Sequence, residues 1–389
     1  MTAALARSMQ TDARAEFARD GYLVLRGLLD PERHVLPLAH AYEALIEALA
    51  GIHAGDPRTA AVRPPIGAGT GERLAFALGA SGGEVLHHLA PVLSLFSSRF
   101  RWRPDLPPAQ LPEIFALTRD PALLDAVEAL IGSEITASPI YHLNTKLSRT
   151  HLADAEALAQ RLRRRSPGAT IYYGFEVGNT PWHMDAIAGL RDSHAAPIVI
   201  AWIPLTPADL DRGALRVVPG SHRDGVRAGP FDVELIRRAT TIDAVPGDVV
   251  LMDNKLVHSG SENRSRDEIR LACNLRYVPT GAPTGRPYLP AFVARSRTAP
   301  HSELTSADVW AAMWRQAFAA LSRGGLPVPH PATTSHARAR AITEAWQRAA
   351  PDPAGWLRLR HDPTRSAAAR TVRRLTVALR RGLRRSRGQ

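Results

Sequence analysis

The chain is poor in cysteine and in lysine. A single cysteine, Cys273, stands among 389 residues, which excludes a disulfide within the chain and a zinc site built on cysteines. Lys146 and Lys255 are the two lysines among 49 basic residues, so arginine carries nearly all of the positive charge. A bias of this kind indicates the base composition of the source genome before it indicates function.

Long hydrophobic runs are also missing. No stretch reaches the roughly 18 uninterrupted apolar residues of a membrane span. The first residues, MTAALARSMQTDARAEF, lack the apolar central region of a signal peptide, so we expect a cytoplasmic protein. Hydrophobic residues at 45% and charged residues at 22% are ordinary for a folded domain and exclude wholesale disorder.

The net charge of +12 is unevenly distributed. Residues 358–389 contain eleven arginines and one acid, Asp362, so the charge describes a tail rather than the body of the protein. Its last helical pattern, over 367–385, is basic and amphipathic, which suits peripheral contact with an anionic membrane. A charge run is more often a solvated surface. We predict no specific nucleic-acid partner, and the oligomeric state stays open.

The pattern of short strands defines the organisation of the chain. We expect a helical and strand flank over 1–134, a β-rich core over 135–290, a helical extension over 291–350 and the basic tail over 351–389. The core contains short β-rich runs separated by turn residues: 140–147, 170–177, 197–204, 214–218, 249–252 and 271–278. This spacing predicts a mainly β core with flanking helices, arranged as an antiparallel sandwich or barrel.

Two other segments have distinct patterns. Residues 152–165 resemble a charged surface helix inserted into the β core. Residues 51–72 are rich in glycine and proline and predict a loop. The GAGTGE run in that loop is not a phosphate-binding motif, because no Lys-Ser/Thr follows it and no apolar strand precedes it.

The sequence Trp182-His183-Met184-Asp185 carries the strongest chemical signal. Side chains two residues apart on a strand point to the same face, so His183 and Asp185 present an imidazole and a carboxylate side by side. Two histidines and one carboxylate form the facial triad of non-haem Fe(II) oxygenases. A His-x-Asp alone is a weak signal, because it occurs by chance in many chains.

A downstream histidine and arginine complete the pattern. His258 ends a predicted strand 73 residues after Asp185, and Arg270 opens the next strand. A triad leaves metal positions for a chelating 2-oxo acid and for dioxygen (O2). The distal carboxylate of that acid calls for a planar, bidentate cation, which an arginine supplies. Arg266, four residues before Arg270, is a rival for this role.

Several stretches resemble the phytanoyl-CoA dioxygenase family of Fe(II)/2-oxoglutarate-dependent oxygenases. They are FARDGYLVLRGLLD, WHMD, WIPLTPADLDRGALRVVPGSHRDG, PGDVVLMDNKLVHSGSENRSRDEIR and LACNLRY, over roughly residues 15–280. The resemblance implies a double-stranded β-helix (jelly roll) with α-helical additions at both ends. It implies iron binding by His183, Asp185 and His258 and 2-oxoglutarate binding by Arg270.

Three further residues are candidate co-substrate contacts. Lys146 matches a lysine that the family often has on the strand before the motif, and the alternative is a surface lysine. Asn144 and Thr206 are possible polar contacts. Other side chains have weaker claims: His222 suits a loop-stabilising role, His142 is an alternate ligand, and Trp182, Tyr173 and Trp202 either shape a pocket or pack in the core.

These observations lead to a function with one alternative. We expect a dioxygenase that hydroxylates a small-molecule substrate and releases succinate and CO2. Asp185 argues against a halogenase, in which halide replaces the carboxylate. The alternative is a non-catalytic jelly-roll binding protein, with the tail mediating membrane or nucleic-acid association. The substrate cannot be identified from the residues, and the resemblance does not imply a CoA ester.

Overall fold

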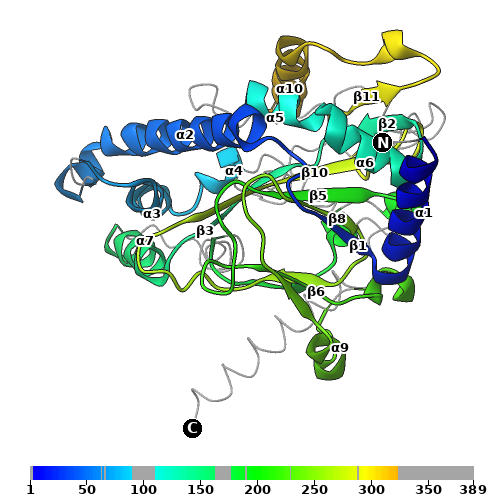
Figure 1. The fold of residues 1–389 in the computed structure, drawn as a ribbon. Coiled ribbons are helices and arrows are strands. Elements are labelled where there is room, and N and C mark those ends of the chain that lie inside the picture. The colour runs from blue at the N-terminus through cyan, green and yellow to red at the C-terminus, as the bar shows by residue number, and fades with distance from the viewer. Residues whose placement is uncertain are drawn as a thin grey trace.

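A computed structural model describes residues 3–62, 64, 67–89, 110–162, 177–188, 191–227, 229–286 and 289–322. Within them, helices, a large sheet and a smaller sheet form successive layers (Figure 1). Most of the strand expected over 170–177, the end of the expected helical extension and the whole basic tail fall outside the described residues. The domain limits stay a prediction.

The large sheet has seven strands, all paired antiparallel. Its long central strand is β10, which pairs with β5 on one side and with both β2 and β3 on the other. In spatial order the strands are β1 (Tyr22–Leu25), β8 (Val249–Asp253), β5 (Val199–Pro204), β10 (Arg270–Pro279), β2 (Glu134–Ala137) and β11 (Phe292–Ser296), with β3 (His142–Lys146) also on β10.

The smaller sheet has four antiparallel strands. In order they are β4 (Thr180–His183), β9 (His258–Gly260), β6 (Leu215–Val217) and β7 (Thr240–Ile242). Leu215 and Val217 of this sheet pack in one cluster with Ile200 and Val250 of the large sheet. The two sheets therefore face each other across a shared interior, which confirms the expected antiparallel β core with flanking helices.

Alternation along β10 separates the two sides of the large sheet. Leu271, Cys273, Leu275 and Tyr277 belong to the apolar core beneath the helices. The intervening residues Arg270, Ala272, Asn274 and Arg276 consequently face the smaller sheet. The strand thus turns an apolar face to the helices and a largely polar face to the interior.

Helices cover the outer face of the large sheet (Figure 1). The described helices are α1 (Ala3–Asp20), α2 (Leu36–Ala54), α3 (Thr70–Ser81), α4 (Leu86–Leu89), α5 (Pro112–Thr118), α6 (Pro121–Ile131), α7 (Arg149–Arg161), α9 (Val233–Arg237) and α10 (Ala307–Ser322). Residues 31–54 are long and apolar enough to cross a membrane by length and composition. Buried core helices share these properties, and α2 buries Leu38, Tyr42, Ile46 and Leu49 completely.

The expected inserted helix is confirmed. The inserted helix is α7, whose first turn is capped by the Ser148 hydroxyl accepting from the His151 amide. The apolar stripe of α10 packs on the core: Trp310 contacts the rings of Phe115 and Tyr141, and Trp314 meets Tyr141 edge-on.

The structure corrects two expectations. The predicted loop over 51–72 ends in helix, because α3 begins at Thr70. Gly71 permits the close approach of α7, since a Cβ at this position would lie 2.5 Å from the His151 ring. The chain after Pro290 does not turn directly helical, because Phe292–Ser296 adds the edge strand β11 to the large sheet.

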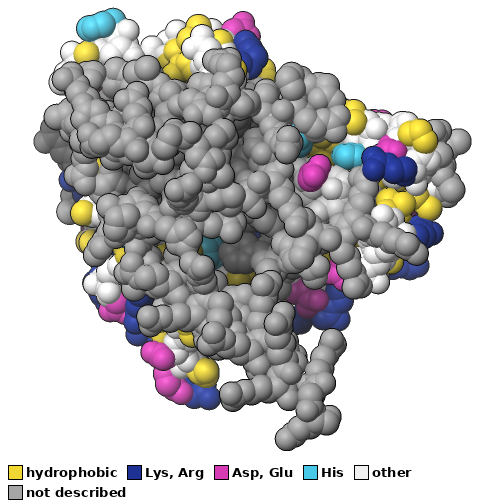
Figure 2. All heavy atoms as spheres, turned by 180° about the vertical axis from the view of Figure 1, so that it is seen from behind, with side chains coloured by type: hydrophobic (Ala, Val, Ile, Leu, Met, Phe, Trp, Pro, Cys, Tyr) yellow, Lys and Arg dark blue, Asp and Glu magenta, His cyan; other side chains and the backbone are white. Residues whose placement is uncertain are grey.

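Exposed charges of the described residues are locally balanced. On the face shown in Figure 2, basic and acidic side chains lie beside one another. Exposed ion pairs include Arg149 with Glu262 and Arg227 with Asp224, each at 2.7 Å. The described part of the protein therefore presents mixed charge, as the sequence predicts for the chain before the tail.

Candidate metal centre

The side chains of His183, Asp185 and His258 converge on one point. One ligand atom from each residue lies within 4.8 Å of the others. His183 and His258 are directly opposed across β4 and β9, with ring centroids 4.2 Å apart. The residues predicted from the sequence to bind a metal are thus brought together by the smaller sheet.

Alternation along the His-x-Asp segment sets this arrangement. Trp182 and Met184 pack in a separate apolar cluster with Val218 and Val257. His183 and Asp185 therefore turn the other way, toward the interior. Trp182 also lies under the Arg216 guanidinium, 5.0 Å from the ring centroid, so Trp182 packs away from the metal centre.

Backbone carbonyls orient both imidazoles. The Nδ1 atom of His183 lies 2.8 Å from the Pro181 carbonyl oxygen, and Nδ1 of His258 lies 3.0 Å from the Leu256 oxygen. A carbonyl only accepts, so each Nδ1 carries the proton and each Nε2 has a lone pair for a metal. The Nε2 atoms of His183 and His258 lie 3.9 Å from Oδ1 and Oδ2 of Asp185, respectively.

The surroundings favour the protonation states that a metal requires. Burial, together with the neighbouring His258, lowers the pKa of His183 to about 4. Burial alone would raise the pKa of Asp185, but Arg276 and the adjacent imidazoles outweigh it and hold that pKa well below its ordinary value. The centre therefore offers a neutral imidazole and an ionised carboxylate at neutral pH.

Sequence reasoning missed Arg276, which pairs with Asp185. Its Nη2 lies 2.8 Å from Oδ1, while Oδ2 is buried and has no hydrogen-bond partner. The available signal was alternation, because Arg276 and Arg270 are an even number of residues apart on one strand. Oδ2 of Asp185, which has no hydrogen-bond partner, and the Nε2 atoms of His183 and His258 can serve as the three donors of a facial triad. These residues therefore fit a divalent iron ion.

Arg270 is buried without a carboxylate partner among the described residues. It is 3% exposed, and its Nε and Nη1 atoms have no hydrogen-bond partner. Burial lowers the pKa of Arg270 to about 10, so it stays charged at neutral pH. Its guanidinium carbon lies over the Trp202 ring, 5.8 Å from the ring centroid. The rival Arg266 lies exposed in the preceding turn, and geometry therefore favours Arg270.

Lys146 lies directly opposite Arg270 in the β3–β10 pairing. It is 1% exposed, and its ammonium donates to the Gly178 carbonyl at 2.5 Å and to the Thr180 hydroxyl. This placement rules out a surface lysine. Asn144 is half-buried, two residues before Lys146 and opposite Ala272.

Thr206 is hydrogen-bonded to the start of β10. Its hydroxyl accepts a hydrogen bond from the Leu271 amide at 2.9 Å and lies 3.4 Å from the Ile269 carbonyl oxygen. These contacts are made to the residues on either side of Arg270. Thr206 therefore fixes the backbone that carries the Arg270 guanidinium. A direct contact between Thr206 and a co-substrate stays a prediction.

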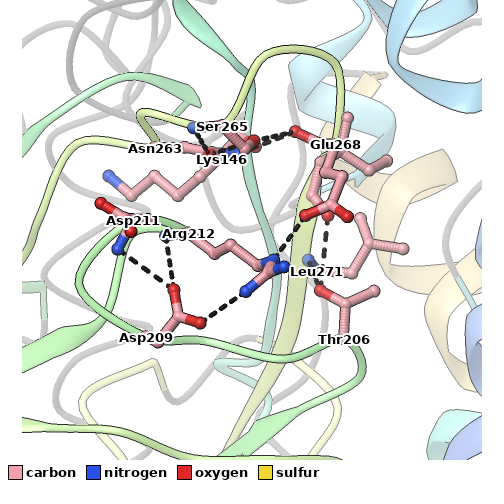
Figure 3. Close-up of polar contacts among 10 residues, drawn as sticks. Lys146, Thr206, Asp209, Asp211, Arg212, Asn263, Ser265, Glu268 and Leu271 are labelled. Atoms are coloured by element: carbon pink, nitrogen blue, oxygen red, sulfur yellow. Dashed lines mark hydrogen bonds and ion pairs between the residues drawn. The ribbon is translucent and has the colours of Figure 1, made fainter.

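Hydrogen bonds lock the turn between His258 and Arg270 (Figure 3). The buried Asn263 amide donates to the carbonyls of Lys146 and Glu268 at 3.0 and 2.9 Å. Its Oδ1 accepts from the amide and the hydroxyl of Ser265. Arg212 adds ion pairs to Glu268 and Asp209. The segment between His258 and Arg270 therefore forms an ordered turn that keeps Arg270 buried.

The alternate histidines lie outside the triad. His222 contacts the Ala18 carbonyl at the end of α1, 3.2 Å away, in the loop-stabilising role expected for it. His142 lies on the inner face of β3 opposite Asn274, and its buried Nε2 has no hydrogen-bond partner. Burial, followed by the charge of Arg276, lowers the pKa of His142 to about 4. Tyr173 is outside the described residues.

The fold and the triad together define an oxygenase of the non-haem iron class, and the chain belongs to the phytanoyl-CoA dioxygenase (PhyH) family, whose model matches residues 17–272. Its three converging side chains are of the kind that hold Fe(II) in non-haem iron oxygenases. A stretch of 78 residues is 35% identical to Dioxygenase FrzG of a Cladobotryum species, covering 19% of this chain and 26% of FrzG.

One solved structure shows a similar fold at low identity. The non-haem monooxygenase ThoJ in its apo form is 15% identical, with a TM-score of 0.50 over 87% of this chain and 99% of ThoJ. The non-haem alpha-ketoglutarate-dependent epimerase SnoN from nogalamycin biosynthesis is 19% identical, with a TM-score of 0.41 over 72% of this chain and 87% of SnoN.

Proposed function

We propose that this dioxygenase hydroxylates a small-molecule substrate and couples that reaction to the conversion of 2-oxoglutarate into succinate and CO2. We further propose that the two facing sheets form a double-stranded β-helix. Iron, when bound, supplies the activation of dioxygen. His183, Asp185 and His258 would hold the iron, and Arg270 would bind the distal carboxylate of 2-oxoglutarate.

The buried guanidinium of Arg270 is the observation that carries the proposal. A buried cation with unpartnered donors is costly unless a ligand pairs with it. A carboxylate matches the planar fork of a guanidinium, with two parallel hydrogen bonds. Arg270 and Arg276 occupy the same face of β10, with Ala272 and Asn274 between them. This order supports a co-substrate extended along β10 from Arg270 toward the triad.

The alternative is a binding protein that keeps the scaffold without catalysis. A non-catalytic scaffold has no requirement for three metal-binding donors within 4.8 Å of one another. Nor does it require an unpaired arginine on the same interior face. These features favour the enzyme.

The experiment that tests the proposal measures succinate. Purified protein is supplied with Fe(II), 2-oxoglutarate and O2, and succinate release is followed while a panel of small metabolites is screened. We expect slow release without a substrate, faster release with a matching metabolite and a product that is 16 Da heavier by mass spectrometry. Failure to bind either Fe(II) or 2-oxoglutarate would instead support the binding protein.

A further inference from the structure

Arg276 makes the two oxygens of the Asp185 carboxylate inequivalent. Nη2 of Arg276 lies 2.8 Å from Oδ1. Oδ2 is buried, has no hydrogen-bond partner and lies 3.9 Å from Nε2 of His258. Each oxygen lies 3.9 Å from one imidazole, Oδ1 from Nε2 of His183 and Oδ2 from Nε2 of His258. Oδ1 is in addition engaged by a protein cation, which leaves Oδ2 as the oxygen without a hydrogen-bond partner.

A second contact fixes the main chain of the same residue. Nη1 of Arg276 donates to the Asp185 carbonyl oxygen at 3.2 Å. The planar guanidinium thus spans the side chain and the backbone of Asp185 at once, which a single ammonium group could not do with the same geometry. The carboxylate is restrained both in its rotation and in the position of its Cα atom.

Arg276 itself is held on a rigid element. It is 4% exposed and is paired with Ile200 across β10 and β5. On the other side of β10, its carbonyl accepts a hydrogen bond from the Ser138 amide at 2.8 Å. The anchor for Asp185 is therefore a central strand that is bonded on both sides, and not a loop.

We propose that Arg276 is a positioning residue that limits Asp185 to one metal–oxygen bond, made through Oδ2. This inference rests on the function proposed above. A carboxylate that bound through both oxygens would take an additional coordination position. A facial triad needs its remaining positions for the 2-oxo acid and for dioxygen. By engaging Oδ1, Arg276 keeps that additional position open.

A simpler role for Arg276 is a buried counter-ion that only stabilises the fold. Both roles predict that loss of the arginine destabilises the protein, so stability does not separate them. The number of water molecules bound to the metal does separate them, because only the positioning role controls how many positions Asp185 occupies. The affinity for 2-oxoglutarate at saturating metal should change in the same direction.

The experiment uses Mn(II) as the probe, with Arg276→Lys, Arg276→Met and the control Arg295→Met. Arg295 on β11 also forms ion pairs, with Asp125 and Glu128 at 2.5 and 3.0 Å. Metal-bound water is counted by water-proton relaxation, and 2-oxoglutarate is titrated without oxygen. We expect both Arg276 variants to lose one metal-bound water and to bind 2-oxoglutarate about tenfold more weakly, of the order of the 10- to 100-fold loss of metal affinity or activity that is typical when a metal ligand loses its supporting partner. Arg295→Met should match the wild type.

Arg276→Lys keeps the positive charge, so it decides the question even if Arg276→Met does not fold. If folded Arg276→Lys has the wild-type number of metal-bound waters and the wild-type affinity for 2-oxoglutarate, the positioning role is overturned. The proposed function is unaffected by that result. A wild-type protein that takes up no Mn(II) overturns the proposed function, and the inference falls with it.

Discussion

Arg270 on β10 lies directly opposite Lys146 on β3, so two buried cationic side chains occupy one end of the interior between the sheets. Six residues further along β10, Arg276 contacts the Asp185 carboxylate. The interior face of one strand thus connects a cationic end with a metal-binding end. The predictions below test each end separately.

Removal of one triad histidine should abolish metal binding. We expect His183→Ala to lose tight Fe(II) binding and turnover, because two remaining donors no longer define a face. Equilibrium dialysis with Fe(II) under anaerobic conditions gives the stoichiometry. His222→Ala is the control, since His222 contacts the end of α1, and it should bind one Fe(II) per chain. Unchanged stoichiometry in folded His183→Ala would refute the assignment.

Acid should destabilise the metal-free protein through His142. Its pKa is lowered to about 4 in the fold, against about 6.5 when unfolded. Above pH 6.5 the group is neutral in both states and contributes no pH dependence. As pH falls from 6.5 toward 4, only the unfolded chain takes up the proton, so the free energy of unfolding falls by at most about 3 kcal/mol. His183 shifts in the same direction.

Urea unfolding at pH 7 and pH 4.5 measures this loss. We expect His142→Phe to lose less stability on acidification than the wild type, while retaining the part due to His183. An equal loss in the two proteins would show that His142 titrates normally in the fold.

The turn before β10 should depend on Asn263. Asn263→Ala removes two donated and two accepted hydrogen bonds, among them the contact from its amide to the carbonyl of the buried Lys146. We expect unfolding free energy to fall by about 1–3 kcal/mol and 2-oxoglutarate affinity to fall, because the turn keeps Arg270 in place. Ser265→Ala keeps both contacts from the Asn263 amide and should have the smaller effect on thermal unfolding and on affinity.

The tail should be dispensable for turnover. Every residue assigned to the site lies between His142 and Arg276, so truncation after Pro363 should leave the turnover rate nearly unchanged. If the tail acts at membranes, the full chain should sediment with anionic vesicles at low salt and be released at high salt. Absence of binding at low salt would discard the membrane role.

The triad could be predicted from the sequence because its geometry is local. His183 and Asp185 share a face by alternation, and His258 opens β9, the strand that pairs beside them. Arg270 could be predicted as well, because it opens the next strand after the turn that follows His258. These positions depend on strand periodicity and pairing, both of which leave a pattern in the residues.

Other parts of the fold depend on contacts that leave no such pattern. The glycines near Thr70 indicate a loop, whereas in the fold Gly71 allows α7 to approach α3 closely. The edge strand β11 is short and follows a proline-rich turn, so its pairing with β2 is a tertiary effect. Arg276 looks like any arginine on a strand until the fold places it against Asp185.

A titration of 2-oxoglutarate into the anaerobic Fe(II)-loaded protein tests the central claim most directly. The wild type should develop a metal-to-ligand absorption band that saturates with 2-oxoglutarate. Arg270→Ala should keep its iron but bind 2-oxoglutarate roughly 30-fold to a few thousand-fold more weakly, since loss of one member of a buried charge pair costs about 2–5 kcal/mol. Arg266→Ala should titrate like the wild type. Wild-type titration by Arg270→Ala would contradict the account.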